Sequence, residues 1–112
     1  GVRCLAGADC YSGYMKMVQS GSSWMGLVPA RILITITQYR PIRDAHKIKC
    51  PVLLIAAAQD SLIPIESTRI AAQKIKQVEY VEWPMGHFDP YDGAWFNENI
   101  KTQLAFLKQQ LS

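Results

Sequence analysis

The sequence predicts an α/β fold in which parallel strands are flanked by helices and preceded by a less regular helical segment. Residues 52–58 form an unbroken apolar run, residues 78–83 form a β-branched and aromatic run, and a stretch of helix-forming residues separates the two. The order strand, helix, strand predicts a right-handed parallel unit. With 112 residues, the chain is long enough to bury one modest core.

The first 49 residues show weaker patterns than the rest of the chain. Tyr39-Arg40-Pro41 is expected to close the last helix here, because the residue before proline is pushed away from helical geometry. The expected segments are a short apolar start at 2–6, a turn-prone stretch at 8–13, a helix at 14–19 and a second helix from Trp24 to about Tyr39, interrupted by Pro29.

The organisation is clearer from Cys50 onward. The apolar run at 52–58 is continuous rather than alternating, which is typical of a parallel strand buried on both faces. Pro64 stands where a first helical turn would begin, so a crossover helix is expected from Ile65 to Lys76. A second strand is expected from Val78 to Trp83.

The last segment of the chain has the strongest helical periodicity. Its apolar residues recur at intervals of three or four positions, which is typical of an amphipathic helix with one apolar face. We expect this face to pack on the sheet, because a lone helix of this length is only marginally stable in water. The residues of the predicted face are Phe96, Ile100, Leu104, Leu107 and Leu111.

Charge and hydropathy exclude several classes of function. The net charge of +3 comes from 12 basic and 9 acidic residues that are scattered along the chain, which argues against a nucleic-acid-binding face. The longest strongly apolar runs are far shorter than the roughly 20 residues of a membrane-spanning helix. The first residues form no signal peptide. We therefore expect a cytoplasmic protein that binds neither nucleic acid nor membrane.

The three cysteines cannot all pair within one chain, which favours free thiols in a reducing compartment. Cys4, Cys10, His46 and Cys50 are chemically suited to zinc, but their spacing matches no known zinc-binding framework. The sequence therefore predicts neither a metal site nor a cofactor.

Asp60 and His87 are the residues most suggestive of chemistry. Each follows a predicted strand, and the carboxyl ends of parallel strands are where such sheets bind their ligands. Neighbouring strands lie about 4.8 Å apart, so the loops that leave them can bring the two side chains within hydrogen-bonding reach. A carboxylate that orients an imidazole base is the arrangement that nucleophilic acyl transfer requires.

Around these two residues the sequence resembles the carboxyl-terminal part of an α/β-hydrolase. In that family a strand ending in the triad acid is followed by a helix, a last strand, a Gly-His with the triad base, and a closing helix. Further matches resemble a bacterial subgroup of uncharacterised α/β-hydrolases, including, more weakly, the cap segment of that subgroup. The matching residues are 50–55, Gln59-Asp60, Ile63-Pro64, Gly86-His87-Phe88, 89–91, Gly93, Phe96, Gln103 and 106–107, and in the cap Ala8-Asp9, Gly13-Tyr14, Trp24, Ala30-Arg31 and 39–41.

The resemblance implies a division into a cap-like segment, residues 1–49, and an incomplete α/β-hydrolase core, residues 50–112. It implies Asp60 as the triad acid and His87 as the general base of an esterase-like or peptidase-like enzyme with a small-molecule acyl substrate. Asp89 and Asp92 are rival acids, because both follow His87 on its own loop. The family often has a glycine just before the acid, where this chain has alanines.

The chain has no obvious nucleophile. It contains no Gly-x-Ser-x-Gly, the motif that carries the nucleophilic serine in this family. Cys10, flanked by small residues at two positions' distance, is one candidate, as in dienelactone-hydrolase-like enzymes. The other interpretation is that the serine and the oxyanion hole precede Gly1 in a longer hydrolase. The chain alone is then expected to be inactive.

A different class of function stays open beside the hydrolase. The chain could be a catalytically inactive fragment or a self-associating scaffold in which Asp60 and His87 are vestigial. A sheet of so few strands leaves unpaired backbone groups at its edge, which are a template for association with a second chain.

Overall fold

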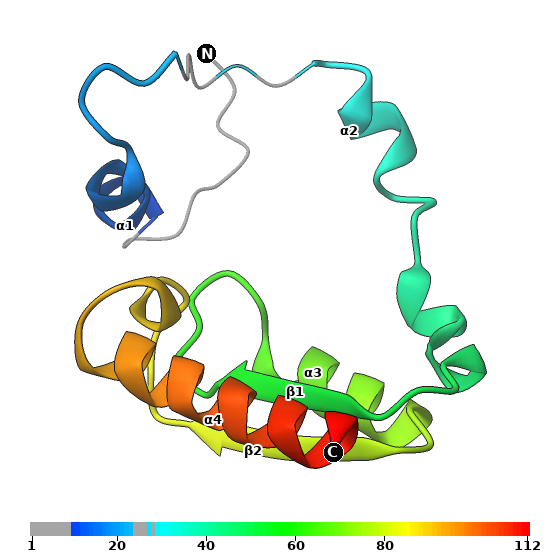
Figure 1. Cartoon of the computed structure of the whole chain (residues 1–112). Coiled ribbons are helices and arrows are strands. Elements are labelled where there is room, and N and C mark those ends of the chain that lie inside the picture. The colour runs from blue at the N-terminus through cyan, green and yellow to red at the C-terminus, as the bar shows by residue number, and fades with distance from the viewer. Residues whose placement is uncertain (1–9, 24–26, 28) are drawn as a thin grey trace.

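A computed structural model describes residues 10–23, 27 and 29–112, and it shows a mixed α/β fold with two parallel strands and helices (Figure 1). The predicted fold class is confirmed at this level. The predictions for residues 2–6, for Cys4 and for Trp24 lie outside the described residues. The elements are α1 (Cys10–Met17), α2 (Ile32–Thr35), short 3₁₀ helices at Pro41–Arg43, Ala45–Lys47 and Asp89–Tyr91, β1 (Val52–Ala57), α3 (Ile65–Lys74), β2 (Val78–Trp83) and α4 (Gly93–Leu111).

The sheet pairs β1 with β2 in parallel, with Val52 opposite Val78 and Ala57 opposite Trp83. The backbone N–H of Val52 donates to the carbonyl of Gln77, just before β2, at 2.9 Å, and that of Ala58 donates to the carbonyl of Trp83, the last residue of β2, at 2.8 Å. Because a strand directs its backbone groups alternately to its two sides, the odd-numbered residues Leu53 and Ile55 turn theirs to the other edge of β1. No strand among the described residues covers that edge.

The two long helices lie on opposite faces of the sheet, with α4 in front of it and α3 behind it in Figure 1. Adjacent residues of β2 fix this arrangement, because successive side chains of a strand point to opposite faces. Glu82 accepts hydrogen bonds from Arg69 of α3 at 2.7 and 3.1 Å. Trp83 stacks on Trp95 of α4, with ring centroids 5.5 Å apart.

The prediction that β1 is buried on both faces is wrong for most of the strand. Only Ala56 is fully buried, at 2% exposure, and the other residues of β1 are half-buried. The open edge explains the difference, because a strand with a neighbour on one side only keeps solvent on the other. A continuous apolar run therefore predicts the strand correctly but overestimates its burial.

The prediction that the apolar face of the last helix packs on the sheet is also wrong. All five residues of that face are between 40% and 82% exposed. The residues that α4 turns inward are instead Trp95, Asn99, Thr102 and Phe106, which are half-buried and recur at helical spacing. Stacking of Trp95 on Trp83 and a hydrogen bond from Asn99 to the carbonyl of Pro90 set this rotation of the helix.

Two predictions for the amino-terminal segment need correction. Residues 10–13 are helical rather than turn-prone, and α1 ends at Met17 instead of Gln19. Of the second predicted helix, the structure describes residue 27 and residues 29–39, and within these only Ile32–Thr35 form an α-helix. The β-branched side chains of that stretch lower its helix propensity, which is consistent with so short a helix.

The described chain is more open than a compact domain of its length. Its radius of gyration is 16.3 Å, whereas a compact domain of this size has about 13 Å. Figure 1 shows the segment with α2 arching away from the strands. Within the part of the chain that the structure describes, no helix has the length and apolar character of a membrane span.

Candidate functional site

The candidate site lies at the carboxyl ends of β1 and β2. Asp60 is the third residue after β1, and His87 is the fourth residue after β2. The two side chains meet there: Nδ1 of His87 lies 2.9 Å from Oδ2 of Asp60. Their side chains are 26% and 10% exposed, respectively. Parallel pairing of the strands thus brings together two residues that are 27 positions apart in the sequence.

The loop after β1 holds the Asp60 carboxylate in place. The backbone N–H groups of Leu62 and Ile63 donate to Oδ1 of Asp60 at 2.7 and 2.8 Å. Partial burial by itself raises the pKa of Asp60, but the hydrogen bonds from Ile63, His87 and Leu62 outweigh it and hold the pKa below its ordinary value. Asp60 is therefore a carboxylate at neutral pH and accepts hydrogen bonds on both of its oxygens.

The Asp60 carboxylate determines which nitrogen of His87 carries the proton. An ionised carboxylate only accepts, so Nδ1 of the neutral imidazole must be the donor and Nε2 must carry the free lone pair. Among the described residues, Nε2 of His87 has no hydrogen-bond partner. The pair therefore presents a basic nitrogen that can take a proton and a carboxylate that stabilises the resulting imidazolium.

The rival acids do not contact His87. Oδ2 of Asp89 accepts the backbone N–H of Gly86 at 2.7 Å, so this residue closes the loop that carries His87. Asp92 is exposed and donates its backbone N–H to the carbonyl of Asp89. No hydrogen bond joins either carboxylate to the imidazole in the described ranges, so Asp60 is the acid that the geometry pairs with His87.

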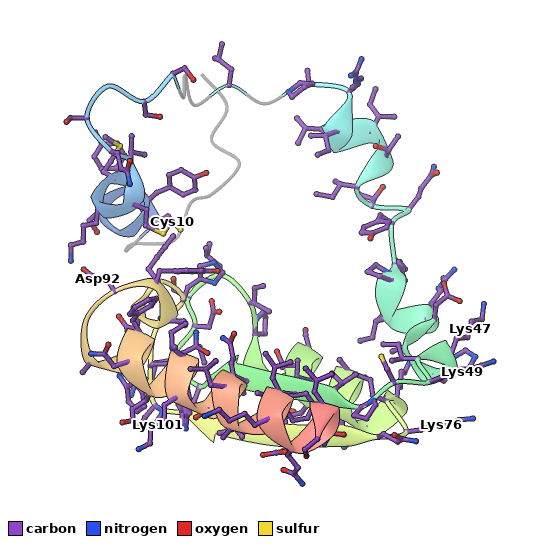
Figure 2. The ribbon with its side chains drawn as sticks, viewed as in Figure 1. Cys10, Lys47, Lys49, Lys76, Asp92 and Lys101 are labelled. Carbon is purple, nitrogen blue, oxygen red and sulfur yellow. The ribbon has the colours of Figure 1, made fainter. Side chains whose placement is uncertain are left out.

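Cys10, the alternative nucleophile, is the first residue of α1 and is 3% exposed. Figure 2 shows it on the side of α1 toward the loop that carries Asp92. No hydrogen bond joins the thiol to His87 among the residues described. The structure therefore brings the predicted acid and base together, whereas this buried thiol has no hydrogen bond to the predicted base within the described residues.

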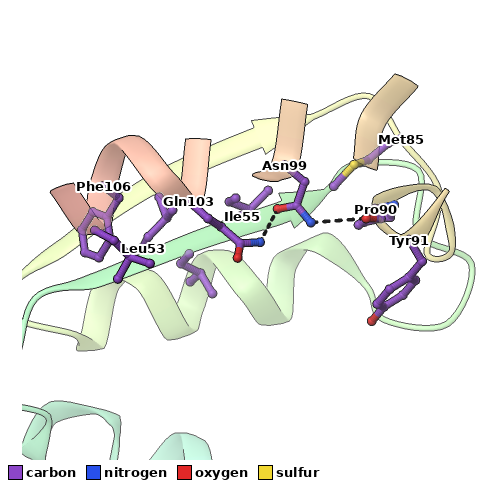
Figure 3. Close-up of a pocket in the computed structure, with 10 residues that line it drawn as sticks. Leu53, Ile55, Met85, Pro90, Tyr91, Asn99, Gln103 and Phe106 are labelled. Carbon is purple, nitrogen blue, oxygen red and sulfur yellow. Dashed lines mark hydrogen bonds between the residues drawn. The ribbon is translucent and has the colours of Figure 1, made fainter. Parts of the chain in front are cut away.

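A groove of about 580 Å³ runs between β1 and α4 (Figure 3). Within it, Asn99 donates to the carbonyl of Pro90 at 3.3 Å, and Gln103 donates to Asn99 at 2.7 Å. Neither Asp60 nor His87 lines the groove. Its lining residues are Leu53, Leu54, Ile55, Met85, Pro90, Tyr91, Asn99, Gln103, Phe106 and Leu107.

Other parts of the described chain offer no second site of this kind. No group of three or more metal-ligating side chains occurs in the described ranges, and Cys10 and Cys50 are free thiols there. Lys47, Lys49 and Lys76 lie where the strands begin, at the opposite end from Asp92 (Figure 2). These three lysines therefore lie at the end of the sheet opposite to the loop that carries Asp92.

Comparison with known proteins gives this site a context. No family model matches the chain. The quorum-quenching protein AidA of Acinetobacter baumannii is 35% identical to it over 101 residues, which are 90% of this chain and 33% of that protein. The chain is homologous to AidA.

Beyond AidA, two Escherichia coli proteins, each described as an uncharacterised 31.7 kDa protein of the traX-finO intergenic region, are 33% identical over 88 residues. These residues are 75% of this chain and 30% of each E. coli protein. The chain thus spans about a third of the length of AidA and of the other curated relatives that it matches.

Sequence reasoning missed the residues that support Asp60 and His87. The backbone N–H groups of Leu62 and Ile63 hold the carboxylate, and the aspartate itself was the available signal, because its side chain commonly accepts hydrogen bonds from the backbone just after it. Phe88 lies edge-on to His87, with ring centroids 4.9 Å apart. No local pattern predicts that contact.

Proposed function

We propose that this chain supplies the acid and the base of an α/β-hydrolase that cleaves an ester, amide or similar acyl bond. The observation that carries the proposal is the hydrogen bond between Asp60 and His87 at two adjacent strand ends, where Nε2 of His87 has no hydrogen-bond partner among the described residues. Homology to AidA, a protein named for quorum quenching, supports it. The substrate proposed is a small acyl compound, and the quorum-sensing signals that carry such a bond are the natural compounds to assay after a generic ester.

In the proposed reaction, Nε2 of His87 takes the proton of a serine hydroxyl while the oxygen attacks the carbonyl carbon of the substrate. The imidazolium then gives this proton to the leaving group, and the acyl-enzyme forms. Water, deprotonated in turn by His87, attacks the carbonyl carbon of the acyl-enzyme. The bond to the serine oxygen then breaks, the imidazolium returns its proton to that oxygen, and the acid is released. Asp60 keeps the proton of the neutral ring on Nδ1 and stabilises the charged ring in both steps.

The serine and the oxyanion hole belong, in this proposal, to a part of the protein that this chain does not include. The chain spans about a third of its relatives' length, and it contains no Gly-x-Ser-x-Gly. The division into a cap-like segment, residues 1–49, and a core, residues 50–112, belongs to the same proposal, as does a cytoplasmic location. The chain by itself is proposed to be inactive.

The test is ester hydrolysis by the complete gene product, with p-nitrophenyl acetate as the first substrate. Asp60→Asn, His87→Gln and the double variant should each lower kcat by several orders of magnitude. Because residues that act as a unit are strongly non-additive, the double variant should be little worse than His87→Gln alone. Multiplicative losses would show that the two residues act separately.

One observation favours a second candidate, a self-associating scaffold. The outer edge of β1 carries backbone groups without a partner strand in the described chain, and the exposed apolar face of α4 lies next to the groove beside it. Such edges and faces promote association with a further chain. Sedimentation velocity of the 112-residue chain tests this candidate, since a scaffold forms a defined oligomer at micromolar concentration.

A further inference from the structure

Helix α1 contacts the loop that carries His87, and Gly13 lies against Phe88 there. Gly13 is buried, and a Cβ atom built on it would lie 2.3 Å from Cδ2 and 2.5 Å from Cγ of Phe88. Real Cβ atoms do not approach other atoms so closely. These ring atoms lie near the root of the side chain, so a small rotation of its tip cannot relieve the clash. Glycine is therefore what lets the helix backbone rest on the Phe88 ring.

Phe88 in turn packs on the imidazole. Its ring is edge-on to His87, with centroids 4.9 Å apart and planes 76° apart. It also meets Tyr14 of α1, with centroids 6.5 Å apart and planes 82° apart. Edge-to-face pairs of this kind are a favoured packing geometry of aromatic rings. The Phe88 ring thus contacts both α1 and His87.

A single hydrogen bond cannot fix the plane of the His87 ring. The bond from Nδ1 to Asp60 fixes one atom, and Nε2 has no partner among the described residues. Rotation about that bond would swing Nε2 away from the position where it meets a nucleophile. A base must be held within about 10–20° of its productive orientation, which requires packing as well as hydrogen bonding. The Phe88 ring supplies that packing.

We propose that α1 is a positioning element for His87, with Gly13 and Phe88 as the positioning residues. The helix rests on Phe88, Phe88 fixes the plane of the imidazole, and Nε2 is thereby directed toward the nucleophile. This inference rests on the proposed function insofar as it concerns turnover, but the packing itself is independent of any activity. It assigns to the amino-terminal segment a role in orienting the base.

The test compares Gly13→Ala with Lys16→Ala, an exposed position on the same helix. Alanine has a higher helix propensity than glycine by about 1 kcal/mol, so a purely local role predicts a more stable α1 and an unchanged site. We expect instead that Gly13→Ala changes the environment of His87. In the 112-residue chain, the ring-proton NMR signals of His87 should shift in Gly13→Ala and stay in Lys16→Ala, with His46 as the internal reference.

Phe88→Leu and Phe88→Tyr keep the inference testable if Gly13→Ala unfolds the chain. Loss of the aromatic ring in Phe88→Leu should shift the His87 signals. Phe88→Tyr keeps the ring and should leave these signals close to their wild-type positions. In the complete gene product, Gly13→Ala and Phe88→Leu should lower kcat by about tenfold to a hundredfold with KM unchanged.

The two proposals fail in different ways. His87 signals that stay unchanged in Phe88→Leu, or in a folded Gly13→Ala, would overturn the positioning role even in an active hydrolase. Shifted signals in a gene product without esterase activity would keep the positioning role and reject the hydrolase.

Discussion

Nδ1 of His87 and Oδ2 of Asp60 lie 2.9 Å apart at the carboxyl ends of two adjacent parallel strands. The strand register brings the two loops to the same end of the sheet, and the backbone N–H groups of Leu62 and Ile63 hold the carboxylate there. This hydrogen bond determines which nitrogen of the neutral imidazole carries the proton, and the proposed role of His87 as a base follows from it.

The first prediction concerns the tautomer of His87. The neutral ring should carry its proton on Nδ1, because the Asp60 carboxylate can only accept. Long-range ¹H–¹⁵N NMR of the 112-residue chain at alkaline pH measures this directly. In Asp60→Ala the preference for Nδ1–H should be lost, while exposed His46 behaves alike in both proteins. A ring protonated on Nε2 in the wild-type chain would contradict the assignment of Asp60.

The second prediction concerns stability against pH. The pKa of Asp60 is lowered in the folded state, so its contribution is fully present above the unfolded value of about 3.9 and is lost as pH falls through the lower folded value. Asp60→Asn should therefore destabilise the chain by about 1–2 kcal/mol at pH 7. Urea unfolding at pH 7 and in the acid range measures this difference. A gap between the two proteins that persists undiminished at the lowest pH would be inconsistent with this linkage.

The third prediction tests which face of α4 meets the sheet. Trp95→Leu removes the stacking on Trp83 and should lower the free energy of unfolding by about 1 kcal/mol. Phe96→Leu changes the neighbouring aromatic residue on the exposed face and should stay within about 0.5 kcal/mol of wild type. Chemical denaturation of both variants measures these changes in the free energy of unfolding. A larger loss in Phe96→Leu would mean that the helix is rotated relative to the structure.

The fourth prediction concerns the cysteines. Cys50 is exposed and Cys10 is 3% exposed, so iodoacetamide should modify Cys50 rapidly and Cys10 only when the chain opens. Peptide mass spectrometry after brief labelling gives the two rates, with urea-unfolded chain as the reference. Rapid alkylation of Cys10, together with esterase activity that the same reagent abolishes, would instead support Cys10 as the nucleophile.

The fifth prediction concerns self-association. If the exposed face of α4 joins two copies, Leu104→Glu should shift sedimentation toward the monomer, because it buries a charge in an apolar contact. Gln109→Glu adds the same charge at an exposed polar position of α4 and should leave sedimentation unchanged. A chain that is monomeric at high micromolar concentration without any substitution would reject the scaffold.

Local patterns predicted the elements of the sheet well and their surroundings poorly. The strand Val78–Trp83 has the predicted bounds, because β-branched and aromatic residues are followed there by the turn-forming Pro84. The apolar spacing of α4 revealed an apolar face. It could not reveal which face the sheet would bury, because Trp83 and Trp95 fix that by a tertiary contact.

In the candidate site, too, one contact could be predicted from the sequence and another could not. The closeness of Asp60 and His87 could be predicted, because two paired parallel strands have their carboxyl ends at the same end of the sheet. The contact between Gly13 and Phe88 could not, because the two are 75 positions apart in the sequence and the local pattern around the glycine predicts a turn. Its function there is to permit a close approach, which only the folded chain reveals.

The most direct test of the proposed acid–base pair is the turnover of p-nitrophenyl acetate by the complete gene product, compared between His87→Gln and His46→Gln. We expect kcat to fall by about 10³-fold or more in His87→Gln and to stay near wild type in His46→Gln. Near-wild-type turnover in a folded His87→Gln would rule out His87 as the base.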